Sequence, residues 1–301
     1  MMQEIFHLIG YASGIAGADE HCSGGPDAVQ QSVYLKALMD KGLPLVWEQT
    51  VRPDERDLSS RPDQAVRQIN EKLAHLTATL TRQNQFFSII GGDHTSAIGT
   101  WSGVQDVKRE AGEIGLIWID AHMDSHTPET TESGRIHGMP LAALLGFGYP
   151  TLTTILNHSA KFKPENVCLI GVRSYEKGEA ALLKRLNIRT YMMEEVSQRG
   201  FITVLQEAIQ LVSRHTIGYG LSIDLDALDP KDAPGVDVPE PNGIHANDLI
   251  SGLSDVLPDP RLLGVEIVEF DPTKDKAQLT EKLIAQLIDV IATKVLSHAK
   301  A

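Results

Sequence analysis

The sequence has few cysteines, no long apolar run and no excess of basic side chains, and each shortage excludes a class of protein. Its two cysteines, Cys22 and Cys168, lie far apart and form no Cys-x-x-Cys pair. Residues 1–30 lack a basic segment followed by an apolar core, and no apolar run reaches the length of a membrane span. We therefore expect a protein of the reduced, cytoplasmic compartment, without a membrane partner.

Acidic residues dominate the charge. The chain carries 27 Lys and Arg against 40 Asp and Glu, for a net charge of −13. This balance argues against a nucleic-acid or anionic-membrane partner and suits a small cationic substrate or a metal ion. With 301 residues and 42% hydrophobic content, the chain can bury one large α/β core or two smaller ones.

Apolar, strand-like runs alternate with helical patterns along the chain. This alternation is typical of a mostly parallel sheet covered by helices. Eight strands could also close into a (β/α)8 barrel, so the pattern does not separate an open sheet from a barrel. The predicted strands lie near residues 4–10, 45–50, 86–91, 115–120, 166–171, 188–192, 217–224 and 262–268.

Proline and glycine delimit several helices. One helix is predicted to begin after Gly25-Pro26 and end at Gly42, and a second to begin at Ser60 with Pro62 just inside it. Further helices are predicted near 136–146, 177–187, 195–214, 246–256 and 276–298. Two irregular segments, 125–135 and 230–245, directly follow candidate ligands, so we expect them to form the walls of a cleft.

Three clusters of carboxylate and imidazole residues each follow a predicted strand. Residues i, i+2 and i+4 of an extended chain point the same way, so the cluster at 120–124 can converge on one centre. Two imidazoles with four carboxylates are more than one ion usually takes, and a bridged pair of divalent ions fits better. The six candidate ligands are His94, Asp120, His122, Asp124, Asp224 and Asp226.

Taken singly, two of the clusters also have a purely structural explanation. Asp93 in Gly91-Gly92-Asp93-His94 could cap the following helix, and Asp224-Leu225-Asp226 could form a turn. The Asp-x-His-x-Asp cluster is different, because burying three ionisable groups at a strand end is costly without an ion. Together, and in this order after successive strands, the three clusters favour metal binding.

At these residues the chain resembles the ureohydrolase family, which includes arginase, agmatinase and formiminoglutamase, and arginase is the closest likeness. The resemblance implies a three-layer αβα fold with an open, eight-stranded, mostly parallel sheet, and one catalytic domain over residues 1–301. It rests on Gly25-Pro26, the segments 91–94, 120–124 and 222–230, and Glu269 before Asp271-Pro272.

The resemblance implies two Mn2+ ions per chain, with Co2+, Ni2+ or Fe2+ as alternatives, and a homo-oligomer, either trimer or hexamer. Ligation rich in carboxylates with only two histidines also favours Mn2+ over zinc. By position, one ion would be held by His94, Asp120, Asp124 and Asp224, and the other by Asp120, His122, Asp224 and Asp226. Asp120 and Asp224 would then bridge the pair.

The segment 127–138 resembles the arginase loop that recognises the α-carboxylate of the amino acid. Thr131 and Ser133 fall on its hydroxyl positions, and His137 falls on its catalytic histidine. Glu269 matches the carboxylate that orients the guanidinium group, and Asp124 is placed to relay a proton to the departing amine, with His137 as the shuttle to solvent.

Three positions depart from the arginase pattern. His126 stands where arginases usually carry asparagine, and Glu176 stands where an aspartate meets the α-amino group. Val238 replaces a threonine in the loop after the third cluster. We expect His126, with Thr131 and Ser133, to bind the substrate carboxylate and Glu176 its ammonium group.

The expected reaction is hydrolysis of a guanidino group to release urea, with L-arginine giving L-ornithine as the leading substrate. The guanidinium carbon is a poor electrophile, and divalent ions can supply hydroxide at neutral pH. The same chemistry on agmatine, a guanidino acid, guanidine or formiminoglutamate is the nearest alternative. Two further classes are a zinc-dependent deacetylase-like amidohydrolase and a non-catalytic binding relative.

Overall fold

The computed structural model describes residues 5–17, 20–54 and 61–298. Its centre is a single sheet whose strand pairs are all parallel, and every predicted strand is confirmed to within two residues at its described ends. The strands are β1 Phe6–Tyr11, β2 Leu45–Val51, β3 Phe87–Gly91, β4 Gly115–Ile119, β5 Val167–Val172, β6 Arg189–Met192, β7 Tyr219–Asp224 and β8 Leu262–Val268.

The sheet is open, with the order β2-β1-β3-β8-β7-β4-β5-β6, so the barrel alternative is wrong. β2 and β6 form the two edges, and β8 is inserted between β3 and β7. Because all pairs are parallel, the carboxyl ends of the strands meet at one edge of the sheet. The four central strands, β3, β8, β7 and β4, therefore present the residues that follow them side by side.

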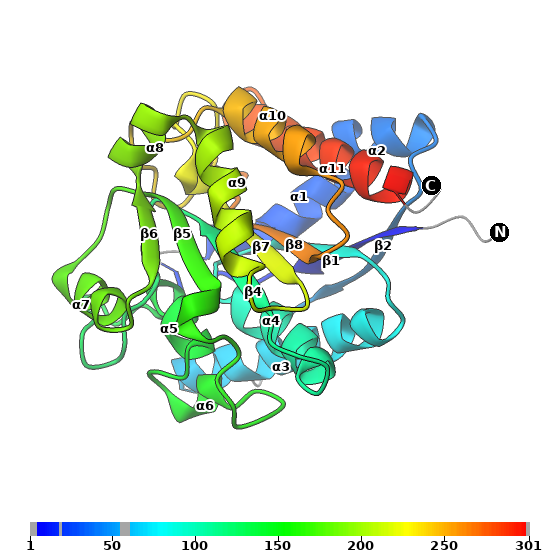
Figure 1. Ribbon diagram of the computed structural model, residues 1–301. Coiled ribbons are helices and arrows are strands. Elements are labelled where there is room, and N and C mark those ends of the chain that lie inside the picture. Colours follow the sequence, from blue (N-terminus) through cyan, green and yellow to red (C-terminus); the bar gives the residue numbers. More distant parts are fainter. Residues whose placement is uncertain (1–4, 18–19, 55–60, 299–301) are drawn as a thin grey trace.

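Helices cover both faces of the sheet and complete the three-layer αβα architecture (Figure 1). One face carries α1 Gly25–Gln31, α2 Val33–Asp40, α8 Met193–Arg199, α9 Phe201–Val212, α10 Ala246–Val256 and α11 Leu279–His298. The other carries α3 Pro62–Arg82, α4 Ser96–Lys108, α5 Pro140–Leu144, α6 Pro150–Thr153 and α7 Lys177–Arg185.

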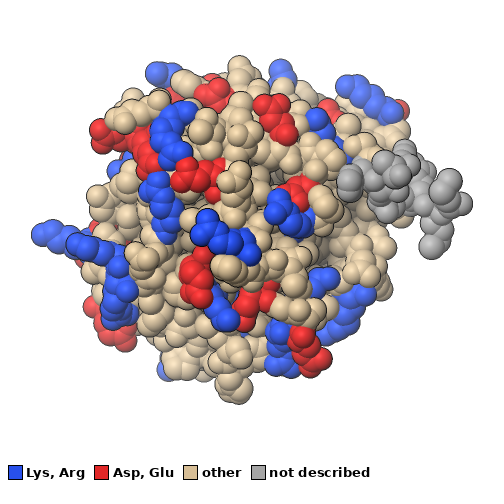
Figure 2. All heavy atoms as spheres, in the orientation of Figure 1, with Lys and Arg blue, Asp and Glu red and all other residues tan. Residues whose placement is uncertain are grey.

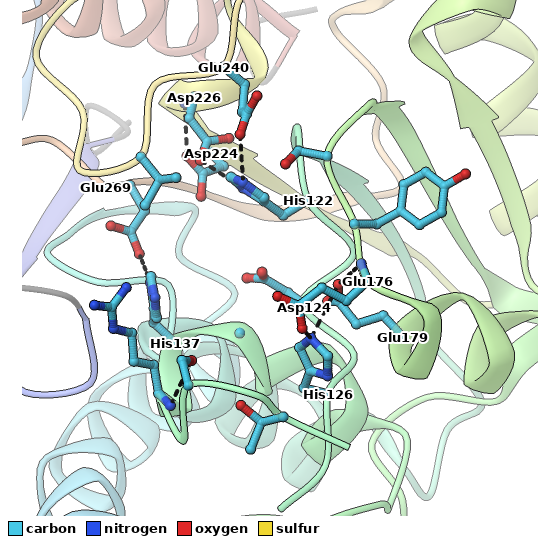
Figure 3. A pocket seen from close by; sticks show the side chains of 17 residues that line it. His122, Asp124, His126, His137, Glu176, Glu179, Asp224, Asp226, Glu240 and Glu269 are labelled. Carbon is cyan, nitrogen blue, oxygen red and sulfur yellow. Dashed lines mark hydrogen bonds and ion pairs between the residues drawn. The ribbon is translucent and has the colours of Figure 1, made fainter.

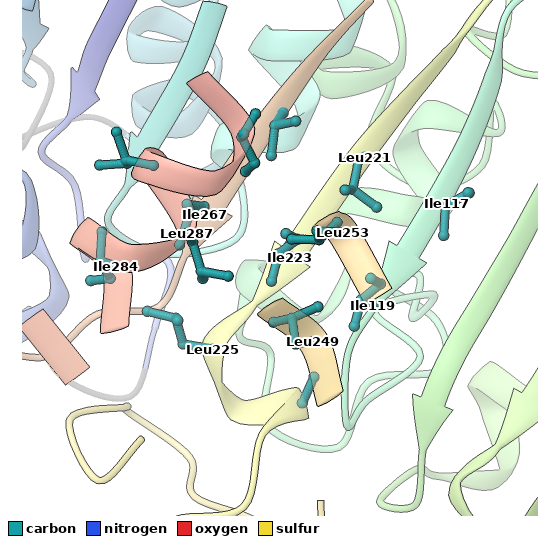
Figure 4. Close-up of a cluster of buried hydrophobic side chains, with 14 of the residues drawn as sticks. Ile117, Ile119, Leu221, Ile223, Leu225, Leu249, Leu253, Ile267, Ile284 and Leu287 are labelled. Atoms are coloured by element: carbon teal, nitrogen blue, oxygen red, sulfur yellow. The ribbon is translucent and has the colours of Figure 1, made fainter. Parts of the chain in front are cut away.

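Alternate residues of each central strand supply the cores on the two faces. Ile117 and Ile119 of β4 pack with the residues of α9, α10 and α11, whereas Trp118 packs on the side of α3 and α4. Figure 4 shows the first core, in which Ile223 of β7 lies among side chains of β4, β8 and the covering helices. Since both faces are buried, the strands are almost continuously apolar, as parallel strands usually are.

Two predicted helices are each divided in the structure. The helix expected up to Gly42 is broken at Ser32, whose extended backbone separates α1 from α2 and whose hydroxyl accepts the N–H of Tyr34 at 3.1 Å. The helix expected over 195–214 is broken at Gly200, which has φ +82°. Both corrections have a local cause, because serine caps a helix start and glycine adopts the left-handed conformation.

Other helix predictions need smaller corrections. The predicted start at Ser60 lies outside the described residues, and α3 begins at Pro62. The helix expected over 136–146 is only the five-residue α5, preceded by the 3-10 turn Ile136–Gly138. The pattern gave no bounds for α4 or α6, since the glycine- and serine-rich α4 has little amphipathic periodicity.

Charges of both signs are interspersed on the face shown in Figure 2, and neither sign gathers there in one extended patch. Among the helices that the structure describes, none combines the length and apolar character that a membrane span requires.

The prediction that the two irregular segments, 125–135 and 230–245, form the walls of a cleft is confirmed, because residues from both line the cavity described below.

The α3–α4 pair sets the position of the segment after β3, because α4 begins two residues after His94. The helices approach closely at glycine. A Cβ atom on Gly103 would lie 2.1 Å from Thr77 Oγ1 and 2.3 Å from the carbonyl oxygen of Ala74. The absence of a side chain therefore permits this packing.

We predict that Gly103→Ala destabilises the protein by about 1–3 kcal/mol, the usual range for overpacking a filled core. Alanine is the better helix former by ~1 kcal/mol, but that gain is smaller than the cost of separating the two helices. Thermal or urea unfolding measures the effect, with the exposed change Ser251→Ala in α10 as the control. An alanine variant as stable as the parent would contradict the close approach.

Candidate metal centre and adjoining cleft

The six candidate ligands come together at the carboxyl edge of the central strands. His94 follows β3, the group from Asp120 to Asp124 follows β4, and Asp224 and Asp226 end and follow β7. Asp93 accepts the N–H of Thr95 at 3.0 Å through Oδ1 and the hydroxyl of Ser13 at 3.2 Å through Oδ2. It therefore joins the turn before α4 to the segment after β1 and does not cap the helix, whose N-cap is Thr95.

Two groups of ligand atoms form within this cluster. His94, Asp120 and Asp124 make one group, and Asp120, His122 and Asp226 make the other; in each, all atoms lie within 4.8 Å of one another. Asp120 belongs to both. Its Oδ2 lies 3.3 Å from His94 Nδ1 and its Oδ1 lies 3.5 Å from His122 Nδ1, so the two oxygens face different groups, as a bridging carboxylate requires.

Asp224 lies beside the first group, with Oδ2 at 3.0 Å from His94 Nδ1. Its other oxygen, Oδ1, accepts the backbone N–H of Asp226 at 2.8 Å. The expected bridging role of Asp224 stays a prediction, because only one of its oxygens faces a histidine. Asp124 and Asp226 also lie close to the rings, at 3.2 Å from His94 Nδ1 and 3.0 Å from His122 Nδ1, respectively.

Burial makes this concentration of carboxylates costly. Desolvation and the charge of Asp120 raise the pKa of Asp124 to about 7, and desolvation also raises the pKa of Asp224 and Asp226. Burial opposes ionisation of Asp120 too, but hydrogen bonds and charge from His122 and His94 outweigh it and lower its pKa. A divalent cation would relieve the repulsion, so the donor set fits a pair of such ions.

Glu269, directly after β8, occupies the side of the cluster nearest His137. Its Oε1 accepts the backbone N–H of His94 at 2.8 Å and lies 3.4 Å from His137 Nδ1, while its Oε2 lies 3.5 Å from Cys22 Sγ. Burial opposes protonation of His137, but the hydrogen bond and charge of Glu269 outweigh it and raise the pKa of His137 to about 9. Asp237 completes a third group of metal-capable atoms with these two residues.

Two of these residues have a strained backbone. Asp124 has φ +45° and Glu269 has φ +64°, a region that costs a residue with a side chain roughly 1–2 kcal/mol. Each is held by its neighbours: the carbonyl of Asp124 accepts the N–H of Leu141, and the N–H of Glu269 donates to the carbonyl of Gly92. Such strain at a cluster of charged groups indicates a functional site.

A cavity of about 300 Å3 opens outward from this cluster (Figure 3). At its far end His126 Nε2 lies 2.7 Å from Glu176 Oε2 and 3.5 Å from Glu179 Oε2. Thr131 and Ser133 line the same cavity, as do Asp124, His137 and Glu269. The residues predicted to bind metal and those predicted to bind substrate therefore share one cleft, with His94 and Asp120 buried behind it.

Several lining residues were not identified from the sequence. Glu240 Oε1 lies 3.8 Å from His122 Nε2, and Glu179 accepts the N–H groups of Ser125 and Glu176. Arg135 also lines the cavity. Arg135 and Glu240 lie within the two irregular segments that were expected to form the walls of the cleft. No spacing rule distinguishes a wall residue that faces inward.

A sequence model of the arginase family matches residues 6–293. The chain belongs to the arginase family. Arginase of Bacillus caldovelox is 40% identical over 235 residues, which are 78% of this chain and 78% of that protein.

Two solved structures extend this relationship to the fold. The crystal structure of Bacillus subtilis arginase has a TM-score of 0.87 and 32% identity and covers 97% of this chain and 99% of its own. Entamoeba histolytica arginase, solved with L-ornithine, has a TM-score of 0.87 and 27% identity over 97% and 99% of the two chains.

Membership of the arginase family identifies this chain as a hydrolase of amidine C–N bonds that acts on guanidino substrates. The deacetylase and non-catalytic hypotheses are therefore wrong. The family depends on a binuclear metal centre, and this chain has histidine and aspartate clusters able to bind metal.

We predict that the metal-free protein loses stability as the pH rises from about 6 to about 8. In this interval the folded state keeps protons that the unfolded chain has released, because the pKa of His94 and His122 is raised and that of His137 is raised to about 9. Where the unfolded chain binds fewer protons, the free energy of unfolding falls with pH.

Mn2+ bound at His94 and His122 would replace the protons of these two side chains, so the gain in Tm on adding Mn2+ should be larger at the higher pH. Thermal unfolding of chelator-treated protein measures both effects. Asp120→Asn, which removes the shared carboxylate, serves as the control and should gain little at either pH. A metal-free Tm that stays level or rises over this interval would refute the prediction.

Proposed function

We propose that this chain hydrolyses L-arginine to L-ornithine and urea with two divalent ions, Mn2+ by preference. The observation that carries the proposal is the single cleft that joins the metal-capable clusters and Glu269 to Thr131, Ser133, His126 and Glu176. The structure of Entamoeba histolytica arginase was solved in complex with L-ornithine, which supports an amino acid as the product here.

When bound, the two ions would act as Lewis acids and lower the pKa of a water molecule, because neutral water does not usefully attack a guanidinium carbon. His94, Asp120, Asp124 and Asp224 would hold one ion, and Asp120, His122, Asp224 and Asp226 the other. The two groups that share Asp120 support this assignment.

Glu269 is proposed to orient the planar guanidinium group. A carboxylate can accept two N–H groups of a guanidinium in a fork, which adds both strength and direction. The hydrogen bond from the His94 backbone and the contacts of Cys22 and His137 hold the Glu269 side chain beside the clusters. Glu269 lines the cavity, where its oxygens would face the substrate.

Asp124 and His137 are proposed to move the proton that the departing amine requires. Water adds to the guanidinium carbon, the C–N bond to the amino acid breaks, and the amine nitrogen gains a proton from Asp124. His137 exchanges protons with solvent, since it is half-buried at the cavity wall and contacts Glu269. Urea and ornithine balance the atoms of arginine and one water molecule.

The far end of the cleft is suited to the charged end of an amino acid. Thr131 Oγ1 accepts the N–H of Gly134 at 3.0 Å, and Ser133 Oγ accepts the N–H of Arg135 at 3.2 Å. Because each hydroxyl already accepts a bond from the backbone, its own proton remains available to donate to a carboxylate. The neighbouring guanidinium of Arg135 adds positive charge at the same wall.

His126 and Glu176 are proposed to recognise the carboxylate and the ammonium group, respectively. Their contact at 2.7 Å places a donor and an acceptor side by side, which matches the two oppositely charged groups on the α-carbon of an amino acid. Both depart from the residues usual in arginases, so guanidino compounds without the ammonium group are the second candidate substrates. A cytoplasmic location and a trimeric or hexameric assembly stay predictions.

We predict that L-arginine is hydrolysed about 100-fold or more efficiently than agmatine, since losing two bonds to a charged carboxylate costs roughly 3 kcal/mol or more. Urea release from L-arginine, agmatine and 4-guanidinobutyrate, with Mn2+, Co2+ or Ni2+ present, tests this order in kcat/KM. Comparable efficiency with agmatine would reject carboxylate recognition by Thr131 and Ser133. Preference for 4-guanidinobutyrate would reject the ammonium role of Glu176.

We further predict that Glu269→Gln lowers kcat/KM for L-arginine by on the order of 100-fold while Mn2+ binding is kept. The amide can still accept the N–H of His94 but carries no charge to hold the guanidinium. Urea release and Mn2+ titration are measured together, with the exposed change Glu165→Gln as the control. A nearly normal rate in this variant would show that Glu269 does not orient the substrate.

A further inference from the structure

A series of buried hydrogen bonds begins at His94 Nε2, on the side of the ring that faces away from the candidate metal centre. His94 Nε2 lies 2.8 Å from Ser222 Oγ, and Ser222 Oγ lies 2.6 Å from Glu266 Oε1. Trp101 Nε1 reaches the same oxygen of Glu266 at 2.9 Å. All four side chains are 1% exposed or less, so water does not interrupt the series.

The elements that supply these residues meet only in the folded sheet. Ser222 in β7 and Glu266 in β8 are partners in the parallel register of these strands. Trp101 lies in α4, which follows His94 directly. Two neighbouring strands and the helix beneath them therefore converge behind one histidine ring.

The two bonds that Glu266 accepts give this series its direction. Trp101 Nε1 can only donate, and it donates to Glu266 Oε1. The hydroxyl of Ser222 donates its single proton to the same oxygen and offers a lone pair to His94 Nε2. His94 must consequently carry a proton on Nε2.

This direction matters because the other nitrogen of His94 faces the carboxylates. Nδ1 lies 3.0–3.3 Å from oxygens of Asp120, Asp124 and Asp224. A histidine binds a metal through an unprotonated nitrogen, and the bond made by its second nitrogen decides which tautomer is present. A proton held on Nε2 leaves the lone pair of Nδ1 for an ion.

Stacking alone does not determine this orientation. The His94 ring lies on the indole of Trp118, with centroids 4.0 Å apart and planes 9° apart. Such a contact sets the plane of the ring but leaves it free to turn within that plane or flip. The bond from Nε2 to Ser222 removes this freedom.

Burying the carboxylate of Glu266 at this position also costs free energy. It is 0% exposed, and its Oε2 has no hydrogen-bond partner within 3.5 Å among the described residues. A buried polar atom without a partner costs roughly 1–3 kcal/mol. An apolar side chain would pack between the sheet and α4 without this cost, so packing does not account for a carboxylate here.

We propose that Glu266 is a positioning residue that acts through Ser222 to hold His94 in the tautomer and orientation needed for metal binding. The inference rests on the proposed metal centre, in which His94 holds one ion. It assigns a role to a residue that contacts neither substrate nor ion.

The test measures Mn2+ affinity of the full chain by competition with a chelator, without substrate. We expect Glu266→Met, which removes the acceptor at similar size, to weaken the binding of one ion about 10- to 100-fold, the usual effect of losing such a partner. Ser222→Ala should weaken it as much. The double variant should be no weaker than either single variant, because both changes break the same series of bonds.

Two conservative variants separate this role from a general effect on folding. Glu266→Gln retains an acceptor oxygen for Trp101 and Ser222 and should bind Mn2+ within about threefold of the parent. Ser222→Thr keeps the hydroxyl and carries the same expectation if Glu266→Met does not fold. Ser88→Ala in β3 is the matched control, since Ser88 Oγ is buried without a hydrogen-bond partner among the described residues.

Parent affinity in Glu266→Met and Ser222→Ala would overturn the proposal, and so would effects that multiply in the double variant. An equal loss of affinity in Ser88→Ala would overturn it as well. A parent protein that binds no Mn2+ would instead overturn the metal centre itself, so the two failures are distinguishable.

Discussion

Repulsion among buried carboxylates at the carboxyl edge of β3, β7 and β4 is the constraint on which the rest of the structure depends. Asp124, Asp224 and Asp226 are buried together, and desolvation raises the pKa of all three. The imidazoles of His94 and His122 offset part of this cost, whereas the charge of Asp120 adds to it. The remaining negative charge makes the site a place where a cation binds favourably and where a folded protein without one is less stable.

The scaffold around this edge is rigid, which allows it to hold such a cluster. The sheet is buried on both faces, and the close approach of α3 and α4 at Gly103 leaves little room for adjustment. Left-handed backbone conformations at Asp124 and Glu269 persist because neighbouring backbone groups bond to both residues. The energy stored in this backbone is supplied by the packing of the two cores.

The two ends of the cleft are built from different kinds of structure. The metal-capable groups and Glu269 end or closely follow strands, whereas Thr131, Ser133 and Glu240 lie in the two irregular segments. Membership of the arginase family accounts for the shared chemistry of the first end. The departures at His126 and Glu176 fall at the second end, where loops tolerate change and where the proposed recognition of the amino acid would take place.

Local patterns in the sequence predicted the eight strands, most helices and the six residues that meet at the candidate metal centre. Such patterns suffice because hydrophobic periodicity and Asp-x-His-x-Asp spacing are set by residues close together in the sequence. They failed where a single residue interrupts a helix, as at Ser32 and Gly200. These patterns do not predict the order of the strands. Because β8 lies between β3 and β7, residues some 175 positions apart come into contact, as in the bond from His94 to Glu269. Packing between distant elements also decided that Glu240 faces His122 and that Glu266 lies behind Ser222, since such contacts depend on register and burial rather than on spacing along the chain.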